Sequence, residues 1–389
     1  MFYDLASSSW GPEELEAVNR VLADGCFTMG EHVRRFEQAF AARFNVKHAV
    51  MVNSGSSANL VAVAALCFTK ERPLRRGDEV LVPAISWATT FHPLQQYGLK
   101  LRFLDVELDT LNMDVSQLEA ALTRRTRMVV AVSILGNPAA LDVIRAFCDR
   151  HGLYLLEDNC ESMGASLHGR LCGTFGHINT FSTFFSHHIS TMEGGVLTTD
   201  DDELNDLARI IRNHGWARDQ PDVQPPPHLP GWYRFVMPGY NVRPLELCGA
   251  IGVEQLKKLD ALVARRRANA EYFVELFNGD ERFVIQREHG RSSWFSFTLI
   301  LNPRLEIDRA HVMQALREAD IGVRMITGGC FPRHEAIRFF DYETVGPLTN
   351  ANLAHDNGFF VGNHPRDLKT ELTRFREVID RAARPAAVR

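Results

Sequence analysis

The sequence predicts an α/β fold: a large domain with a mostly parallel mixed sheet flanked by helices, and a smaller C-terminal α+β domain. Short apolar segments of strand length alternate with longer segments of helical pattern, which is typical of βαβ units. The chain has 389 residues, long enough for one large and one small domain. An apolar content of 45% and a charged content of 23% are ordinary for a globular protein.

Strands are predicted at His48–Asn53, Glu79–Pro83, Met128–Ser133, Leu153–Glu157 and Trp294–Ile300. Helices are predicted at Ser56–Cys67, from about Ser86, at Ala139–Asp149 and, as one long charged helix, from about Leu256 to Phe277. In a parallel sheet, ligand-binding residues lie just after the carboxyl ends of the strands. This places Ser54–Ser56, Trp87 and Asp158 among the candidates for a site.

The domain boundary is expected near residue 255, where the long charged helix begins. This divides the chain into a large domain, residues 1–255, and a small domain, residues 256–389. Asp219–Pro230 is rich in proline and is predicted to be a long surface loop rather than helix or sheet.

Composition excludes several classes of function. The net charge of −5 and the pI of about 6.3 give no footprint for nucleic acid or for an acidic membrane surface. We expect a cytoplasmic protein, because the N-terminus lacks a signal pattern and no apolar run approaches the roughly 20 residues of a membrane span. The seven cysteines form no Cys-x-x-Cys pair, so no metal site is expected.

Residues 53–59 join a strand to a helix and contain Gly55 and Ser56. Such a turn lets backbone amides approach a phosphate at the helix N-terminus, although it is equally an everyday helix cap. Asp158 follows a buried strand, where a carboxylate can pair with the protonated ring nitrogen of an aromatic cofactor or serve as a structural acid. Trp87 can stack on such a ring or fill the core.

Further candidates come later in the chain. Ser182 can add a phosphate ligand, and His187 can exchange protons at neutral pH, although a lone histidine is more often a satisfied core residue. Asn241 can bind phosphate, and Arg243 can grip a carboxylate with two hydrogen bonds. The alternatives for these two are a turn residue and a surface guanidinium.

Lysine is scarce, and its positions are informative. The six lysines are Lys47, Lys70, Lys100, Lys257, Lys258 and Lys369. None lies between residues 100 and 257, so no small shift in register brings a lysine to the segment around His187.

Eight segments together resemble the fold-type I, pyridoxal-phosphate (PLP)-dependent sugar aminotransferase/dehydratase family of the DegT/DnrJ type over essentially the whole chain. They are Phe27–Glu31, Glu157–Ala165, Phe184–Ile189, Met192–Gly195, His214–Trp216, Pro238–Glu246, Gly252–Leu259 and Phe360–His364. His187 stands where most of the family has a lysine. Imidazole cannot form the Schiff base that lysine forms with the cofactor, so the resemblance is closest to the lysine-free dehydratase branch.

The resemblance implies roles for individual residues. His187 is the general base, Asp158 faces the pyridine nitrogen, Trp87 stacks on the ring and Glu161 lies nearby. The phosphate is held by Gly55, Ser56, Ser182 and, from a second subunit, Asn241. Ser186 and the partner's Arg243 bind the carboxylate of the amino donor, and His214 lines the sugar side. Active sites shared in this way imply a homodimer.

The implied reaction is the C3 dehydration of a nucleotide-linked 4-keto-6-deoxy sugar, GDP-4-keto-6-deoxymannose, in deoxysugar biosynthesis of the colitose type. The cofactor alternates between PLP and pyridoxamine phosphate (PMP), with L-glutamate as amino donor and ammonia released. Two alternatives are a sugar 4-aminotransferase with an unusual base and a non-catalytic descendant of the fold. Residues 324–331 depart from the pattern of the dehydratase branch. The resemblance places this segment in the small domain near the nucleotide-sugar side, so the departure concerns the identity of the nucleotide. An iron–sulfur variant needs a cysteine cluster that the sequence lacks.

Overall fold

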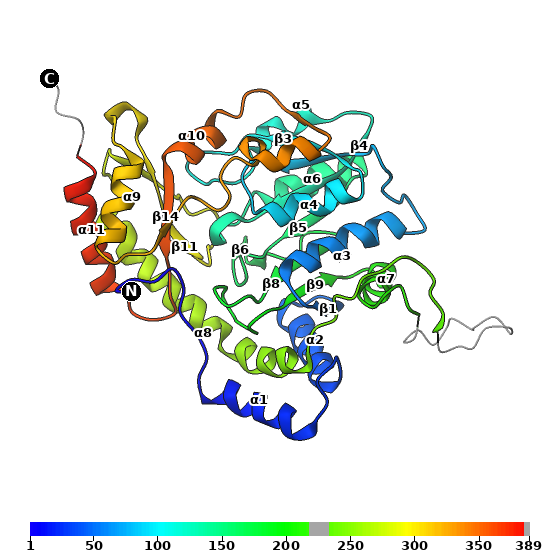
Figure 1. The fold of residues 1–389 in the computed structure, drawn as a ribbon. Helices are drawn as coiled ribbons and strands as arrows, with labels where there is room; N and C mark the ends of the chain where they lie inside the picture. Colours follow the sequence, from blue (N-terminus) through cyan, green and yellow to red (C-terminus); the bar gives the residue numbers. More distant parts are fainter. Residues whose placement is uncertain (218–232, 385–389) are drawn as a thin grey trace.

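The computed structural model describes residues 1–217 and 233–384 (Figure 1). Its first part contains α1 (Pro12–Asp24), α2 (Glu31–Phe44), β1 (His48–Val52), α3 (Gly55–Phe68), β2 (Glu79–Pro83), α4 (Ala88–Gln96), β3 (Lys100–Leu104), α5 (Leu118–Ala121), β4 (Thr126–Val132), α6 (Leu141–His151), β5 (Tyr154–Asp158), β6 (Ser166–Leu167), β7 (Arg170–Leu171), β8 (Ile178–Ser182), β9 (Gly195–Thr199) and α7 (Asp202–Arg212). Its second part contains α8 (Glu246–Phe277), β10 (Phe283–Ile285), β11 (Ser296–Leu301), α9 (Arg309–Glu318), β12 (Val323–Arg324), β13 (Tyr342–Thr344), α10 (Thr349–Asn357), β14 (Gly358–Gly362) and α11 (Lys369–Ala382). The predicted loop Asp219–Pro230 lies outside the described residues.

The central sheet has eight strands in the order β1-β9-β8-β5-β4-β2-β3-β13. From β8 to β13 all neighbours are parallel, whereas β9 is antiparallel to both β1 and β8. Both faces are covered: along β2, Val80 and Val82 pack in the cluster that contains α3 and α4, and Leu81 packs in the cluster that contains α6. Burial of alternate residues on both faces explains the unbroken apolar strands, and the predicted mostly parallel mixed sheet is confirmed.

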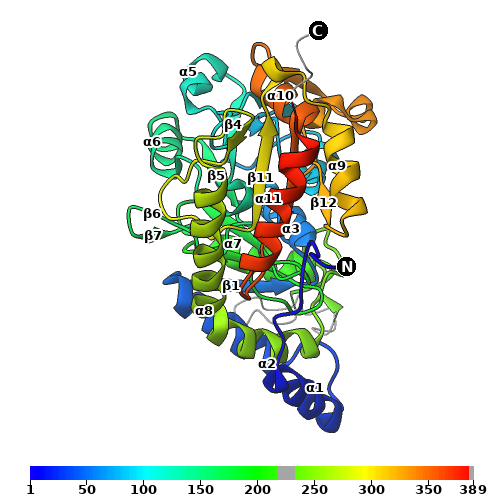
Figure 2. The same cartoon turned by 90° about the vertical axis from the view of Figure 1, so that its left-hand side faces the viewer.

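A smaller antiparallel sheet follows, in the order β10-β11-β14-β12. Helices α8, α9 and α11 pack on it (Figure 2). The N-terminus joins this part, since Tyr3 is fully buried there and its hydroxyl donates to the Gly362 carbonyl at 2.5 Å. β13 returns to the central sheet. The division of the chain at residue 255 stays a prediction.

Helix α8 begins at Glu246, earlier than the predicted start at about Leu256, which was wrong. Its first turns contain Gly249 and Gly252, which read as helix breakers in a sequence. Both are required by packing against α2: a Cβ at Gly249 would lie 2.6 Å from the Val33 nitrogen, and one at Gly252 would lie 2.7 Å from the Phe36 ring. The other predicted strands and helices are present, with ends shifted by a few residues.

The Glu246 side chain fixes the junction between α8 and α2. It is buried and accepts hydrogen bonds from the first backbone amides of α2, those of Gly30 (2.6 Å), His32 (2.5 Å) and Val33 (3.3 Å). A carboxylate at a helix N-terminus satisfies amides that the helix itself cannot, and it complements the helix dipole.

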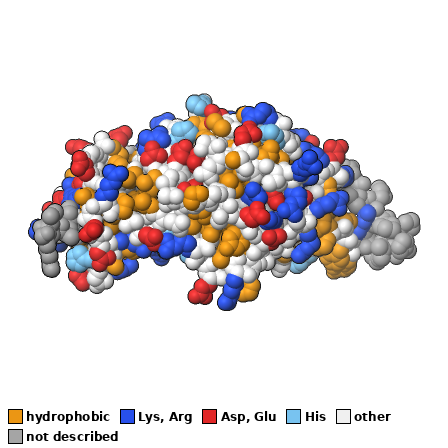
Figure 3. Space-filling view, turned by 90° about the horizontal axis from the view of Figure 1, so that it is seen from above, with side chains coloured by type: hydrophobic (Ala, Val, Ile, Leu, Met, Phe, Trp, Pro, Cys, Tyr) orange, Lys and Arg blue, Asp and Glu red, His pale blue; other side chains and the backbone are white. Residues whose placement is uncertain are grey.

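In the described ranges, 1–217 and 233–384, no helix combines the length and the apolar character needed to cross a lipid bilayer. On the face shown in Figure 3, acidic and basic side chains are intermingled with apolar ones.

Replacing Glu246 tests the role of this junction. Glu246→Ala leaves several buried amides without acceptors, and we expect it to lower the free energy of unfolding by about 2 kcal/mol, with Glu246→Gln less severe. Glu271→Ala, an exposed position on the same helix, is the matched control. Chemical denaturation of the three variants measures the effect, and equal midpoints for Glu246→Ala and Glu271→Ala would contradict it.

Candidate active site

The carboxyl ends of β1, β5 and β8 bring together the residues predicted to hold a phosphate. Gly55 opens α3, and a Cβ there would lie 2.6 Å from the Ser182 Cβ and 2.9 Å from the Cys160 Sγ. Only glycine permits this approach. The amides of Gly55 and Ser56 belong to the first helical turn, where the helix offers no acceptor. The turn therefore unites a helix N-terminus with the Ser182 hydroxyl, as an anion site requires.

The cap alternative for this turn also holds, through a different residue. The Ser54 Oγ accepts a hydrogen bond from the Ser57 amide at 3.0 Å and so caps α3. The Ser56 hydroxyl donates to Thr89 Oγ1 at 2.9 Å, next to the start of α4. Capping by Ser54 leaves Gly55 and Ser56 available for an anion.

Asp158, the last residue of β5, is buried and held by three donors. Its Oδ2 accepts from Asn59 Nδ2 at 2.9 Å and from Thr90 Oγ1 at 2.8 Å, and its Oδ1 accepts from the Cys160 amide at 3.1 Å. Sequence reasoning missed Asn59 and Thr90. The signal for Asn59 was present, since it is a polar residue within the otherwise apolar run of α3. The fixed carboxylate suits a protonated ring nitrogen.

Glu161 lies one turn further along the same segment, and its Oε2 accepts from the Leu135 amide at 2.8 Å. Burial raises the pKa of its carboxyl to about 7; the Leu135 amide opposes this shift, and the charge of Asp158 adds to it. Glu161 therefore exists in both protonation states near neutral pH, so it can donate or accept a hydrogen bond at this site.

The His187 ring is held by a hydrogen bond to a backbone carbonyl. Its Nδ1 lies 2.5 Å from the Cys160 carbonyl oxygen, and because a carbonyl can only accept, Nδ1 carries the hydrogen and Nε2 has the free lone pair. Burial lowers the pKa of His187 to about 4, opposed by the Cys160 bond, and the Arg266 charge lowers it further. The ring is thus neutral at pH 7, with one nitrogen free to accept a proton.

The segment that carries His187 is held by hydrogen bonds within itself and by hydrogen bonds to other segments. The Thr183 amide donates to the Gly194 carbonyl and the Thr191 amide to the Thr183 carbonyl, both at 2.9 Å. Ser190 donates from its amide to Gln255 Oε1 (3.0 Å) and accepts from Trp10 Nε1 (2.9 Å). Contacts from α8 and from the N-terminal segment therefore fix the backbone around the base.

His188 points elsewhere. It is 1% exposed, and its Nε2 lies 3.2 Å from the Ser293 carbonyl oxygen. His188 is therefore packed against the small part, and of these two adjacent histidines His187 is the one that belongs to the candidate site.

Trp87 and Ser186 complete this side. Trp87 immediately precedes α4 and its side chain is 56% exposed, which removes the alternative that it fills the core. Ser186 is half-buried, next to the exposed rings of Phe184 and Phe185.

Asn241, Arg243 and His214 lie close together beyond α7. The His214 amide donates to the Tyr240 carbonyl at 2.8 Å, and Arg243 Nε donates to Asn241 Oδ1 at 3.1 Å. The Asn53 amide donates to the Val242 carbonyl at 3.0 Å, so this group adjoins the phosphate turn. His214 and Asn241 are exposed and available to a ligand or to a second subunit.

The segment that departs from the family pattern, residues 324–331, docks beside Trp87. The Phe331 amide donates to the Ala84 carbonyl at 2.8 Å, and Cys330 forms a β-bridge with Ile85. Residues 324–331 therefore lie against the chain just beyond β2, between that strand and Trp87.

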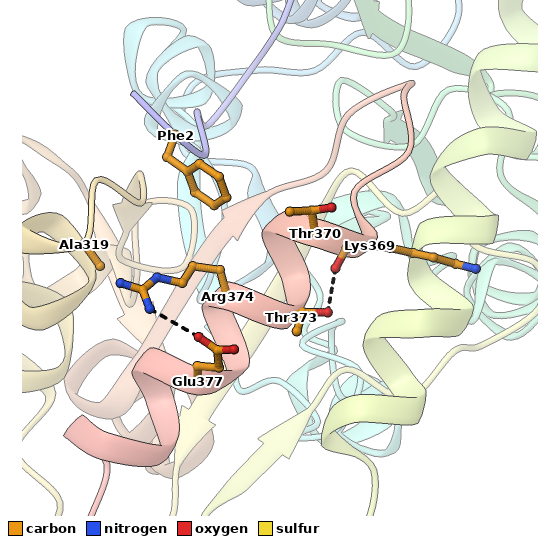
Figure 4. A pocket seen from close by; sticks show the side chains of 7 residues that line it. All are labelled: Phe2, Ala319, Lys369, Thr370, Thr373, Arg374 and Glu377. Atoms are coloured by element: carbon orange, nitrogen blue, oxygen red, sulfur yellow. Dashed lines mark hydrogen bonds and ion pairs between the residues drawn. The ribbon is translucent and has the colours of Figure 1, made fainter.

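None of the six lysines contacts His187. Lys47, Lys100, Lys257 and Lys258 are engaged in ion pairs with Asp202, Glu343, Glu254 and Glu13 or Glu14, and Lys70 and Lys369 are exposed. Lys369 lines a separate surface hollow of about 660 Å³ at the start of α11 (Figure 4). No residue of the candidate site lines that hollow.

Comparison with known proteins identifies close relatives. Residues 9–378 match the DegT/DnrJ/EryC1/StrS aminotransferase family. The chain is 48% identical, over 380 residues, to GDP-4-keto-6-deoxy-D-mannose 3-dehydratase of Yersinia pseudotuberculosis, with 95% of this chain and 96% of that protein covered.

Solved structures agree with this relationship. An asparagine-for-histidine mutant of GDP-4-keto-6-deoxymannose-3-dehydratase with bound GDP-perosamine has a TM-score of 0.94 at 45% identity, over 97% of this chain and 100% of that chain. A structure of GDP-4-keto-6-deoxymannose-3-dehydratase with a trapped PLP-glutamate geminal diamine has a TM-score of 0.94 at 45% identity, over 97% of this chain and 99% of that chain.

The protonation of His187 can be measured directly. We expect its ring to titrate near pH 4, because burial disfavours the imidazolium. The unfolded chain binds this proton near pH ~6.5, so stability due to the neutral ring is lost as the pH falls below that value. NMR of ¹³C-labelled histidines, assigned with His187→Asn, checks this; a midpoint at or above pH ~6.5 would contradict it.

Proposed function

From the premise that the chain belongs to the DegT/DnrJ/EryC1/StrS aminotransferase family, we propose that it is a PLP-dependent 3-dehydratase of GDP-4-keto-6-deoxy-D-mannose. L-Glutamate is the amino donor, and ammonia is released. One observation supports the proposal: a neutral imidazole with Nε2 free lies at the position where the resemblance expects the family's lysine, and the lysines of the chain lie elsewhere. Without a lysine amine the site favours loss of the C3 hydroxyl over net amination.

The residues present fit the cofactor. Gly55, Ser56 and Ser182 would hold the phosphate, since the close contact at Gly55 leaves no room for a side chain there. Asp158, fixed by Asn59 and Thr90, would pair with the ring nitrogen. When bound, PLP or its aminated form PMP supplies the exchangeable amine and an electron-withdrawing ring.

The remaining side chains position the substrates and exclude water. Trp87 would cover the cofactor face, and Ser186 with the partner's Arg243 would bind the glutamate carboxylate. His214 lines the sugar side. Glu161, whose pKa is raised to about 7 by burial and which accepts a hydrogen bond from the Leu135 amide, would lie close to the bound cofactor.

His187 performs the proton transfers. Nε2 would accept the proton that is released when a C–H bond is broken. Nδ1 stays bonded to the Cys160 carbonyl meanwhile. The ring therefore keeps its orientation when it becomes charged. The same Nε2–H is then available to protonate the departing C3 hydroxyl, which leaves as water.

We also propose a homodimer in which Asn241 and Arg243 serve the partner's site. Exposed apolar side chains surround the base segment and the start of α8: Phe27, Phe184, Phe185, Met192 and Leu245. Such a patch marks an interaction surface. A cytoplasmic location suits an enzyme of nucleotide sugars and glutamate whose seven cysteines are all unpaired.

His187→Asn tests the base. Asparagine can still donate to the Cys160 carbonyl but cannot accept the proton, so we expect turnover to fall by about 10²–10⁴-fold with cofactor binding retained. His168→Asn, an exposed histidine outside the site, is the control. Mass spectrometry should show loss of one oxygen from the sugar with wild-type protein, and an ammonia assay should show release. A product that retains nitrogen and the C3 oxygen would instead identify an aminotransferase.

Mixing inactive variants tests the shared site. If Arg243 acts across a two-fold interface, co-expressed His187→Asn and Arg243→Ala chains form heterodimers with one intact site, so activity should recover to roughly a quarter of wild type. Each variant alone should stay inactive. Absence of recovery in confirmed heterodimers would show that Arg243 serves its own subunit.

A further inference from the structure

Arg266 is a buried cation directly behind the catalytic base. It lies within α8 and is 3% exposed. Its guanidinium donates to three backbone carbonyls: those of Phe295 (3.2 Å) and Asn363 from the small part, and that of His187 (3.5 Å). One side chain thus joins the small sheet to the segment that carries the base.

The environment of this guanidinium is unusual. Within residues 1–217 and 233–384 its hydrogen-bond partners are carbonyl oxygens and include no carboxylate, and its Nε is buried with no hydrogen-bond partner there. Burial lowers the pKa of Arg266 to about 10. A buried charge without a counter-ion is destabilising by itself, so packing alone does not account for arginine at this position.

A segment with no role in the proposed chemistry supports Arg266. In residues 360–364, the Asn363 side-chain amide donates to the Arg266 carbonyl (3.1 Å) and to the Trp294 carbonyl (2.8 Å). Asn269, one turn along α8, donates to Asn363 Oδ1 at 3.2 Å. This network fixes both the backbone and the guanidinium of residue 266.

The same contact places an aromatic ring of the small part on the base. The Phe295 ring lies 5.1 Å from the His187 ring in an edge-to-face arrangement, which is a favourable geometry for aromatic pairs. The Phe295 carbonyl is also bonded to Arg266. Arg266 therefore bonds the backbone carbonyl of His187. Phe295, whose carbonyl is also bonded to Arg266, packs against the His187 ring.

We propose that Arg266 is a positioning residue for the dehydration: it ties the His187 backbone to Phe295 and Asn363, so that Nε2 is placed correctly only when the small part is seated against the base segment. This inference rests on the proposed function of His187 as the base. It assigns a role to the network of residues 266, 269 and 363, to which the proposed chemistry gives none.

Two charged groups and one neutral histidine face His187. Arg266 approaches from α8 and Asp158 from the end of β5, while His188 adjoins it on the same segment. Phe295, from the small part, and the Cys160 carbonyl are uncharged. Burial is the main cause of the low pKa of His187; the Arg266 charge lowers this pKa and the Asp158 charge raises it. Removing the Arg266 charge therefore raises it, so the base becomes protonated, and inactive, at a higher pH.

The test compares Arg266→Met, which removes the charge and the donors, with Arg266→Lys, which keeps the charge and loses the planar fork. Arg267→Met is the matched control, because Arg267 neighbours it on α8 and also bonds carbonyls, those of Ser292 (2.7 Å) and Gly164 (3.0 Å), without touching His187. Full-length, PLP-loaded variants are assayed for kcat, KM and their pH dependence.

For both Arg266 variants we expect kcat to fall by about 10²-fold with KM for the sugar little changed. The acid limb of the kcat profile should move to higher pH in Arg266→Met and stay in place in Arg266→Lys. Equal losses in Arg266→Met and Arg267→Met, with no movement of the acid limb, would overturn the proposal and make Arg266 merely structural. If the methionine variant does not fold, the kcat of the folded lysine variant decides, since wild-type kcat there would also overturn it.

A substrate-free measurement separates this inference from the proposed function. The His187 ring of each variant is titrated by NMR in the full-length protein without sugar. An upward shift of the His187 midpoint in Arg266→Met, and none in Arg267→Met, supports the coupling even if the wild type fails to dehydrate the GDP-sugar. The same midpoint in both variants counts against it.

Discussion

The hydrogen bond from His187 Nδ1 to the Cys160 carbonyl (2.5 Å) is the constraint on which the site depends. It fixes the tautomer, and with it which nitrogen can act as a base. The acceptor is a backbone atom just beyond β5, so the position of the ring is set by the sheet itself. A lysine at position 187 would offer a primary amine, which can form a Schiff base with an aldehyde, whereas the imidazole can only exchange a proton.

The ionisable groups around this bond differ in their environments. Asp158 is buried yet satisfied by three donors, and Glu161 has its pKa raised to about 7 by burial. His187, whose ring is bonded to the carbonyl of Cys160 between these two carboxyl groups in the chain, is kept neutral by burial and by the Arg266 charge. Differences in solvation and hydrogen bonding thus give neighbouring positions a carboxyl group held by three donors, a carboxyl group with a raised pKa and a neutral imidazole, which is how acid–base roles are assigned in active sites.

The sequence predicted what depends on local pattern. The strands around Val80 and Val129 were visible because both faces of the sheet are buried, and the missing lysine was visible by register. The start of α8 was predicted too late, because the charged pattern begins only near Leu256 and the contact of Gly249 and Gly252 with α2 is a long-range feature. Asn59, Arg266 and the carbonyl of Cys160 were not identified, since their roles arise from residues distant in the chain and, for Cys160, from an atom that every residue possesses.

These long-range contacts explain why the site belongs to both parts of the molecule. Helix α8 packs on α2 through its glycines at one end and reaches the small sheet at the other, with Gln255 and Arg266 touching the base segment between them. The departing segment at residues 324–331 docks on Ala84 and Ile85, which lead into Trp87. A change in how the small part sits would therefore reach the cofactor face through Trp87 and the base through Arg266. Because both paths begin in the small part, its seating bears on Trp87 and on His187 together, through packing.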